Sequence, residues 1–165
     1  MRQMNARGAT LVELVMTIVI ISVAIAGVVG AFSLLTGRSA DPLNQTRAVA
    51  LAQLYADEIQ SRRYDDSTPI GGTPRVSGCS VNTEESDRSA YDDVDDYNAI
   101  DDEVPQKADG SDLNSAAYGS FRVSVEVTCA GAEVGLPAPD AKRVDITVRD
   151  PSDGLFVFTF YRVNF

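Results

Sequence analysis

The hydrophobic and polar residues divide the chain into an apolar N-terminal run, a periodic middle segment and a C-terminal part in which the two kinds alternate. Residues 14–36 are 23 consecutive positions without a charged side chain. A helix of this length rises roughly 35 Å, enough to cross the hydrocarbon core of a bilayer. Arg2 and Arg7 precede the run, and residues 1–8 contain no acid. The positive-inside rule therefore places the N-terminus in the cytoplasm and the bulk of the chain outside.

Residues 38–63 predict an amphipathic helix that continues after a short break at Pro42. Apolar side chains recur there at steps of three and four, and Arg62 and Arg63 in the last turn suit the negative end of a helix. We expect this segment to lie outside the membrane and to pack its apolar face on a soluble domain. The apolar positions are Leu43, Ala50, Leu51, Leu54, Tyr55 and Ile59.

Residues 120–165 predict an antiparallel sheet of three to four strands. Apolar and polar residues alternate over 121–129 and again over 143–149, which is the period of a half-buried strand. Turn residues at 150–154 lead into 155–163, which is apolar on both faces and should be covered on both sides or by a neighbouring subunit. Because the amphipathic helix can cover one face of this sheet, the expected fold class is α+β.

Residues 64–119 are predicted to form an acidic loop region, since they are rich in Pro, Gly, Ser and Asp. Positions 84–112 hold 12 of the 24 Asp and Glu residues of the chain. The net charge of −10 argues against a nucleic-acid-binding protein, which needs a basic face. The chain has no His, so Ser-His-Asp catalysis, Cys-His catalysis and HExxH zinc chemistry are excluded. We therefore expect no enzymatic activity.

The acidic run of Asp92, Asp93, Asp95 and Asp96 is the candidate metal site of the sequence. Oxygen-rich clusters suit Ca²⁺, but the spacing differs from that of an EF-hand because no glycine occupies the sixth position. A solvated acidic surface is the alternative explanation of the run. Apart from calcium, no cofactor is expected.

Cys79 and Cys129 are the only cysteines of the chain. An outward-facing domain lies in an oxidising compartment, where disulfides persist. A bridge between the two would tie the loop region to the first main strand. Closing a loop of about 50 residues would contribute up to ~4 kcal/mol in the chain-entropy account. Two free thiols are the alternative, and a catalytic dithiol is not expected because the chain has no CxxC motif.

Glu13 is the one charged residue at the start of the apolar run, where a carboxylate is costly without a partner. One explanation is that Glu13 reaches the lipid headgroups. The other requires a cationic amine, which cleavage after Gly8 would create at Ala9, four residues away. In a bundle of identical helices the amine of a neighbour could neutralise Glu13, and such a pair would set the stagger between helices.

A basic leader that ends at Gly8, followed by A-T-L-V-E-L-V and a long apolar helix, resembles the N-terminus of type IV prepilins and pseudopilins. The resemblance implies that a prepilin peptidase cuts between Gly8 and Ala9 and N-methylates Ala9. It also implies that Glu13 is the glutamate at the fifth position of the mature chain. Most major pilins begin with Phe, so Ala9 favours a minor subunit. The implied fold is pilin-like, with residues 9–37 as the transmembrane and assembly helix.

Four further stretches are similar to minor pilin-like proteins of the mannose-sensitive haemagglutinin (MSHA) pilus system: R-S-A-D-P at 38–42, A-V-A-L-A-Q-L-Y-A-D-E-I at 48–59, Y-D-D-V-D-D-Y-N at 91–98 and Y-R-V-N-F at 161–165. The resemblance implies a single-pass inner-membrane prepilin that an assembly platform moves into a surface pilus. Its partners would be other pilins, the prepilin peptidase and that platform. A minor pseudopilin of a type II secretion system and an anchored extracytoplasmic binding domain that never polymerises are the alternatives.

Overall fold

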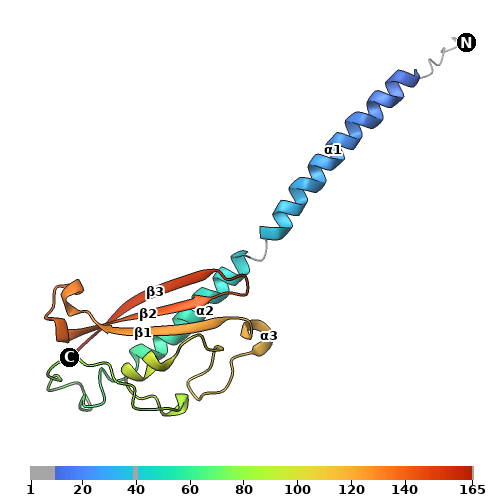
Figure 1. Cartoon of the computed structure of the whole chain (residues 1–165). Helices are drawn as coiled ribbons and strands as arrows, with labels where there is room; N and C mark the ends of the chain where they lie inside the picture. Colours follow the sequence, from blue (N-terminus) through green and yellow to red (C-terminus); the bar gives the residue numbers. More distant parts are fainter. Residues whose placement is uncertain (1–9, 39–40, 165) are drawn as a thin grey trace, which may run out of the picture. The chain divides into compact units, whose positions relative to one another are not determined.

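The computed structural model describes residues 10–38 and 41–164, and the chain is α+β (Figure 1). It divides into two units, Met1–Pro42 and Leu43–Phe165. The first unit contains the apolar helix, and the second contains the sheet. The expected leader, with its cleavage positions Gly8 and Ala9, lies outside the described residues.

The apolar run forms helix α1 (Leu11–Arg38). Thr10 caps its start, because the Thr10 hydroxyl accepts the Glu13 N–H at 3.3 Å and the Thr10 carbonyl accepts the Leu14 N–H at 3.1 Å. Over Leu11–Ser33 the helix is long and apolar enough to cross a membrane, and none of this span is buried within the chain. The side chains of this span are therefore exposed, unlike those of a core helix.

Helix α2 (Asp41–Gln60) carries the apolar face that covers the sheet. Its buried residues include Ala48 and Ala52, whereas the predicted positions Ala50 and Leu54 are exposed. The apolar stripe is therefore rotated from the predicted one, because small alanines suit the close approach of a helix to a sheet. The buried residues of α2 in the core are Ala48, Leu51, Ala52, Tyr55 and Ile59.

The helix ends at Gln60, so the prediction that Arg62 and Arg63 occupy its last turn is wrong. Both arginines follow the helix and form ion pairs. Arg62 pairs with Glu58, at 3.7 Å between Nη2 and Oε1, and Arg63 pairs with Asp66 and Asp92. They connect the end of α2 to the loop region rather than complement the helix dipole.

The predicted sheet has three antiparallel strands, β1 (Arg122–Cys129), β2 (Ala141–Arg149) and β3 (Leu155–Val163), in the order β1-β2-β3 (Figure 1). Alternate residues of β1 and β2 are buried, as their sequence pattern predicts. A tight turn joins β2 to β3, where the Asp150 carboxylate accepts the N–H groups of Ser152 and Gly154 at 2.8 and 2.7 Å.

Strand β3 is at an edge of the sheet and is covered on one face only within this chain. Its phenylalanines at 156, 158 and 160 pack partly buried against the core. On the other face Leu155 and Val157 remain 65% and 60% exposed. The first predicted option, cover on both sides by the same chain, is therefore wrong.

Residues 64–119 contain short helical turns, named η1 (Arg88–Ala90), η2 (Asp95–Ala99) and α3 (Ser115–Tyr118), and they supply part of the core. Turns η3 (Gly131–Val134) and η4 (Ala138–Asp140) lie between β1 and β2. The loop region packs over the sheet through η2, which lies beside β1. Besides Tyr64, its buried apolar residues recur at steps of three along the chain and are Tyr91, Val94, Tyr97 and Ile100.

Candidate functional site

Glu13 occupies the first turn of α1 and is exposed. Within residues 10–38 and 41–164, its carboxylate has no hydrogen-bonding or ionic partner. Its backbone is firmly held, since its N–H bonds to Thr10 and its carbonyl accepts the Thr17 hydroxyl at 2.7 Å. A carboxylate in the first turn complements the positive end of the helix dipole, so part of the role of Glu13 is to favour the start of the helix. The carboxylate itself is available to a group from outside the described chain.

The four aspartates of the predicted metal site do not converge on one point, because each carboxylate faces a different partner. Asp92 pairs with Arg63 at the surface. Asp93 accepts the N–H groups of Asp95 and Asp96 at 2.7 and 3.3 Å. Asp96 accepts the N–H groups of Asp92 and Asp93 at 2.9 and 3.2 Å. The backbone bonds of Asp93 and Asp96 thus hold the turn that leads into η2.

Asp95 has a buried cationic partner, Lys142 of β2. The Lys142 ammonium donates to Asp95 Oδ2 at 2.7 Å and to the Tyr64 carbonyl at 2.8 Å, and it lies 4.4 Å from the centre of the Tyr64 ring. Lys142 is fully buried and Asp95 is 2% exposed. A buried ammonium is tolerated only when paired and hydrogen-bonded, as here. This pair joins the acidic run to the sheet.

Burial and, to a smaller extent, the nearby charge of Asp96 raise the pKa of the Asp93 carboxyl to about 6. Asp93 is 2% exposed and Asp96 is fully buried. The acidic run is therefore part of the interior, and the alternative of a solvated acidic surface applies only to Asp92. Burial distinguishes Asp93 and Asp96 from Asp92, and the sequence alone does not show which of these aspartates is buried.

The structure brings Asp96 together with two acids that the sequence analysis did not select, Glu84 and Glu85. One carboxylate oxygen from each of the three residues lies within 4.8 Å of the others. Hydrogen bonding to Asp96 raises the pKa of the Glu85 carboxyl to about 7, with smaller contributions from desolvation and the charge of Asp96. The only sequence signal for this group was the local density of acids. Residues 85 and 96 are eleven positions apart, and only the fold of the loop brings their carboxylates together.

A second buried charged cluster fastens α2 to the loop region. Arg88 donates to Glu58 at 3.0 Å, and the Tyr97 hydroxyl donates to the same carboxylate at 2.7 Å. The Arg88 guanidinium lies over three tyrosine rings, nearest to Tyr97 with 4.6 Å to the ring centre. Burial and the bond to Glu58 raise the pKa of Tyr97 to about 12, so its hydroxyl remains a donor at neutral pH.

The disulfide expected from the sequence is present between Cys79 and Cys129, whose Cα atoms lie 6.1 Å apart. Cys129 is opposite Lys142 in the β1–β2 register. The Tyr64 hydroxyl beside the bridge donates to the Pro139 carbonyl at 2.9 Å. The disulfide and the buried Lys142–Asp95 pair therefore fasten the loop region to the same end of the sheet.

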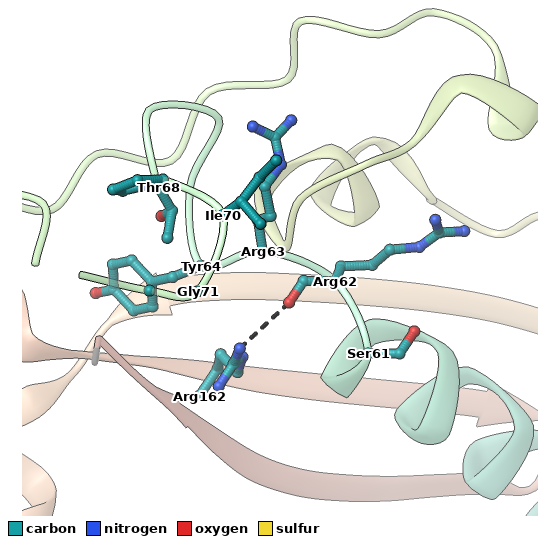
Figure 2. A pocket seen from close by; sticks show the side chains of 10 residues that line it. Ser61, Arg62, Arg63, Tyr64, Thr68, Ile70, Gly71 and Arg162 are labelled. Carbon is teal, nitrogen blue, oxygen red and sulfur yellow. Dashed lines mark hydrogen bonds between the residues drawn. The ribbon is translucent and has the colours of Figure 1, made fainter. Parts of the chain in front are cut away.

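A surface pocket of about 350 Å³ lies where the chain leaves α2 (Figure 2). Its lining includes Arg62, Arg63 and Arg162, together with Ile70 and the loop beside it. Figure 2 shows Arg162 pointing to the backbone of Arg62, whose carbonyl accepts its Nη2–H at 3.3 Å. Arginine offers donors only and stays protonated, so these side chains can bind an acidic group but cannot act as a general base.

A scan against models of protein families, a search of curated proteins and a search of solved structures each found no match to this chain.

Proposed function

We propose that the chain is a structural minor pilin or pilin-like subunit of a type IV pilus of the MSHA type, and that it is not an enzyme. The observation that carries the proposal is α1 itself. A prepilin-like cleavage motif precedes an apolar helix, and no part of its span Leu11–Ser33 is buried within the described residues. Such a helix needs a partner other than water, first lipid and then neighbouring helices.

In the proposed mechanism, helix α1 moves from membrane lipid into contact with the helices of other subunits. The prepilin waits in the inner membrane with residues 1–8 in the cytoplasm, and prepilin peptidase cuts after Gly8 and methylates Ala9. The assembly platform then moves α1 from lipid into a bundle of pilin helices. Because both environments are apolar, the exchange carries little hydrophobic cost, and close packing between helices favours the bundle.

Glu13 is proposed to set the stagger between neighbouring helices by pairing with the Ala9 amine of another subunit. Its position supports this role, because the carboxylate lies at the start of the apolar span and has no partner within the described ranges 10–38 and 41–164. A buried ion pair that loses one partner is strongly unfavourable, so only the paired register would be populated.

The outer face of β3 is proposed as a second contact between subunits. Leu155 and Val157 are apolar and well exposed on an edge strand, which is an unusual combination on an isolated soluble domain. The second sequence-based option for this strand, cover by a neighbouring subunit, is consistent with that exposure. The folded unit would then face solvent on its remaining surfaces.

The proposal is tested by mass spectrometry of the protein isolated from cell membranes and from sheared surface fibres. We expect a mature N-terminus of N-methylated Ala9 in both fractions. A chain that still begins at Met1 would overturn the assignment and leave an anchored binding domain. A processed chain that appears only with the secretion apparatus, and never in fibres, would favour a type II pseudopilin instead.

We also expect Glu13→Ala to be processed normally but to enter fibres at least about tenfold less often, since a lost factor of ten corresponds to ~1.4 kcal/mol. The matched control is Thr10→Ala, which removes the helix cap and keeps the charge. If both variants reduce incorporation equally, the loss is caused by the weakened helix start and not by the missing Glu13 charge. Normal incorporation of Glu13→Ala would refute the register role while leaving processing intact.

A further inference from the structure

Three carboxylates meet at the start of η2. Glu84 is exposed, Glu85 is partly buried and Asp96 is fully buried. One oxygen from each lies within 4.8 Å of the other two. Two of these residues come from an extended loop and the third from η2, so the group joins segments that the backbone does not otherwise hold together at this point.

No cation of the protein neutralises this group within the part of the chain that the structure describes. The nearby acids differ in this respect, because Asp92 has Arg63 and Asp95 has Lys142. None of the ion pairs among residues 10–38 and 41–164 includes Glu84, Glu85 or Asp96. Within the described residues, two of the neighbouring aspartates thus have a cationic partner, and the three close carboxylates have none.

The buried oxygen of Asp96 is the second and independent observation. Asp96 Oδ2 is satisfied by two backbone N–H groups, but Asp96 Oδ1 is buried and has no hydrogen-bond partner within the described residues. A buried anionic oxygen without a partner is costly, and the few that occur in native proteins point to an ion, a water or a proton. Glu85, the side chain that reaches Asp96 here, is also acidic, so the missing partner carries positive charge: a bound cation, or a proton shared between the two carboxyl groups.

We propose that Glu84, Glu85 and Asp96 bind a divalent cation, and that the cation is Ca²⁺. Carboxylate oxygens are hard ligands, and Ca²⁺ accepts six to eight of them in irregular geometry, with water completing the shell on the exposed side at Glu84. Zn²⁺ and copper favour His and thiolate ligands, whereas the chain has no His and both its cysteines form the disulfide. The site differs from the aspartate run, of which only Asp96 contributes.

Bound Ca²⁺ would tie the loop at residues 84–85 to η2, whose Tyr97 lies in the core and whose Asp95 pairs with Lys142. The ion would therefore order the loop region against the folded unit. Extracellular calcium modules bind on the order of 10⁻⁴ to 10⁻³ M, and an exposed three-carboxylate site belongs in that range.

The experiment uses the full chain in detergent, stripped with EDTA and titrated with CaCl₂ at pH 7.5 and constant ionic strength. Calorimetry is expected to give one site per chain, and the midpoint of thermal unfolding should rise with Ca²⁺ more than with equal MgCl₂. Glu84→Gln and Glu85→Gln should each weaken Ca²⁺ binding at least tenfold, and Asp96→Asn should abolish it. The matched control is Glu126→Gln, an exposed acid on β1 outside the group, which should leave the affinity unchanged.

Two results would overturn the site. One is the absence of stoichiometric binding at 10 mM Ca²⁺, on the order of ten times the weakest expected dissociation constant. The other is equal affinity of the Glu84, Glu85 and Glu126 variants and the unsubstituted chain. If Asp96→Asn fails to fold, the two glutamate variants decide, because their side chains are at least partly exposed. The purified chain is sufficient for these measurements, so the pilus proposal can fail without affecting their outcome.

Discussion

Helices α1 and α2 follow one another within a few residues, yet their apolar side chains differ in exposure. In α1 the apolar residues surround the whole helix, and all those over Leu11–Ser33 are exposed. In α2 one face is buried, where Leu51, Tyr55 and Ile59 are at most 1% exposed, whereas Val49 and Leu54 on the remaining surface are 44% and 39% exposed. A one-sided stripe finds its partner in the same chain, whereas an all-round apolar helix requires a partner elsewhere.

Charged residues show the reverse distribution. The first unit has few charged residues and leaves Glu13 exposed, whereas the second buries Arg88, Lys142 and four aspartates. These buried charges are held by one another and by backbone groups. The comparison indicates that the first unit exposes its apolar surface, whereas the second has its own hydrophobic core with charge pairs buried beside it.

The largest expected effect comes from removing Lys142, which would leave Asp95 buried and unpaired. We expect Lys142→Ala to lower the free energy of unfolding of the second unit by about 3–5 kcal/mol. The measurement is urea unfolding of the full chain in detergent, followed by near-UV circular dichroism. The control is Lys107→Ala, at the only other lysine, which is exposed. A loss no larger than that of the control would show that the buried pair does not stabilise the domain.

The second test places the same charge on each helix. Val19 in α1 is 56% exposed and Val49 in α2 is 44% exposed, so exposure alone predicts equal tolerance. We expect Val19→Asp to disfavour membrane insertion by about 2.5–3.5 kcal/mol, measured as loss of the carbonate-resistant membrane fraction. Val49→Asp should leave that fraction unchanged and alter unfolding by no more than about 0.5 kcal/mol. Equal behaviour of the two variants would remove the distinction between the helices.

The smallest expected effect is the pH dependence of the second unit in EDTA. The folded-state pKa values of Asp93, about 6, and Glu85, about 7, lie above their unfolded values, so the folded state binds more protons than the unfolded state between about pH 4 and 7. Stability is therefore expected to fall as the pH rises from 5 to 8, lowering the unfolding midpoint by about 3 °C. Glu85→Gln should reduce this slope. Stability that rises over the same interval would contradict the assigned burial.

The regular elements could be predicted closely because their information is local. Alternation over 121–129 and 143–149 matches strands β1 and β2, and the apolar run at 155–163 matches β3. The charge-free run matches most of α1. Two cysteines in a domain that the sequence predicts to face outward were enough to expect their disulfide. In each case neighbouring residues, or the count of one residue type, carried the signal.

The loop region and the site within it could not be predicted in the same way. The steps of three from Tyr91 to Ile100 were a detectable sign of a buried helical turn, but the surrounding acids suggested a solvated loop. The partners of these acids are distant in sequence: Asp95 meets Lys142 across 47 residues. Nothing local distinguishes Asp96, whose oxygen is buried and unpaired, from Asp92, which pairs with Arg63 at the surface.

By itself, the sequence determined that this chain has an apolar helix, an amphipathic helix and an antiparallel sheet, since hydrophobic period and length are properties of adjacent residues. Only the tertiary structure decided which face of α2 is buried, which acids leave water and which of them meet. The reason is physical: desolvation and pairing depend on what surrounds a carboxylate in space, and that environment exists only once the loop has closed over the sheet.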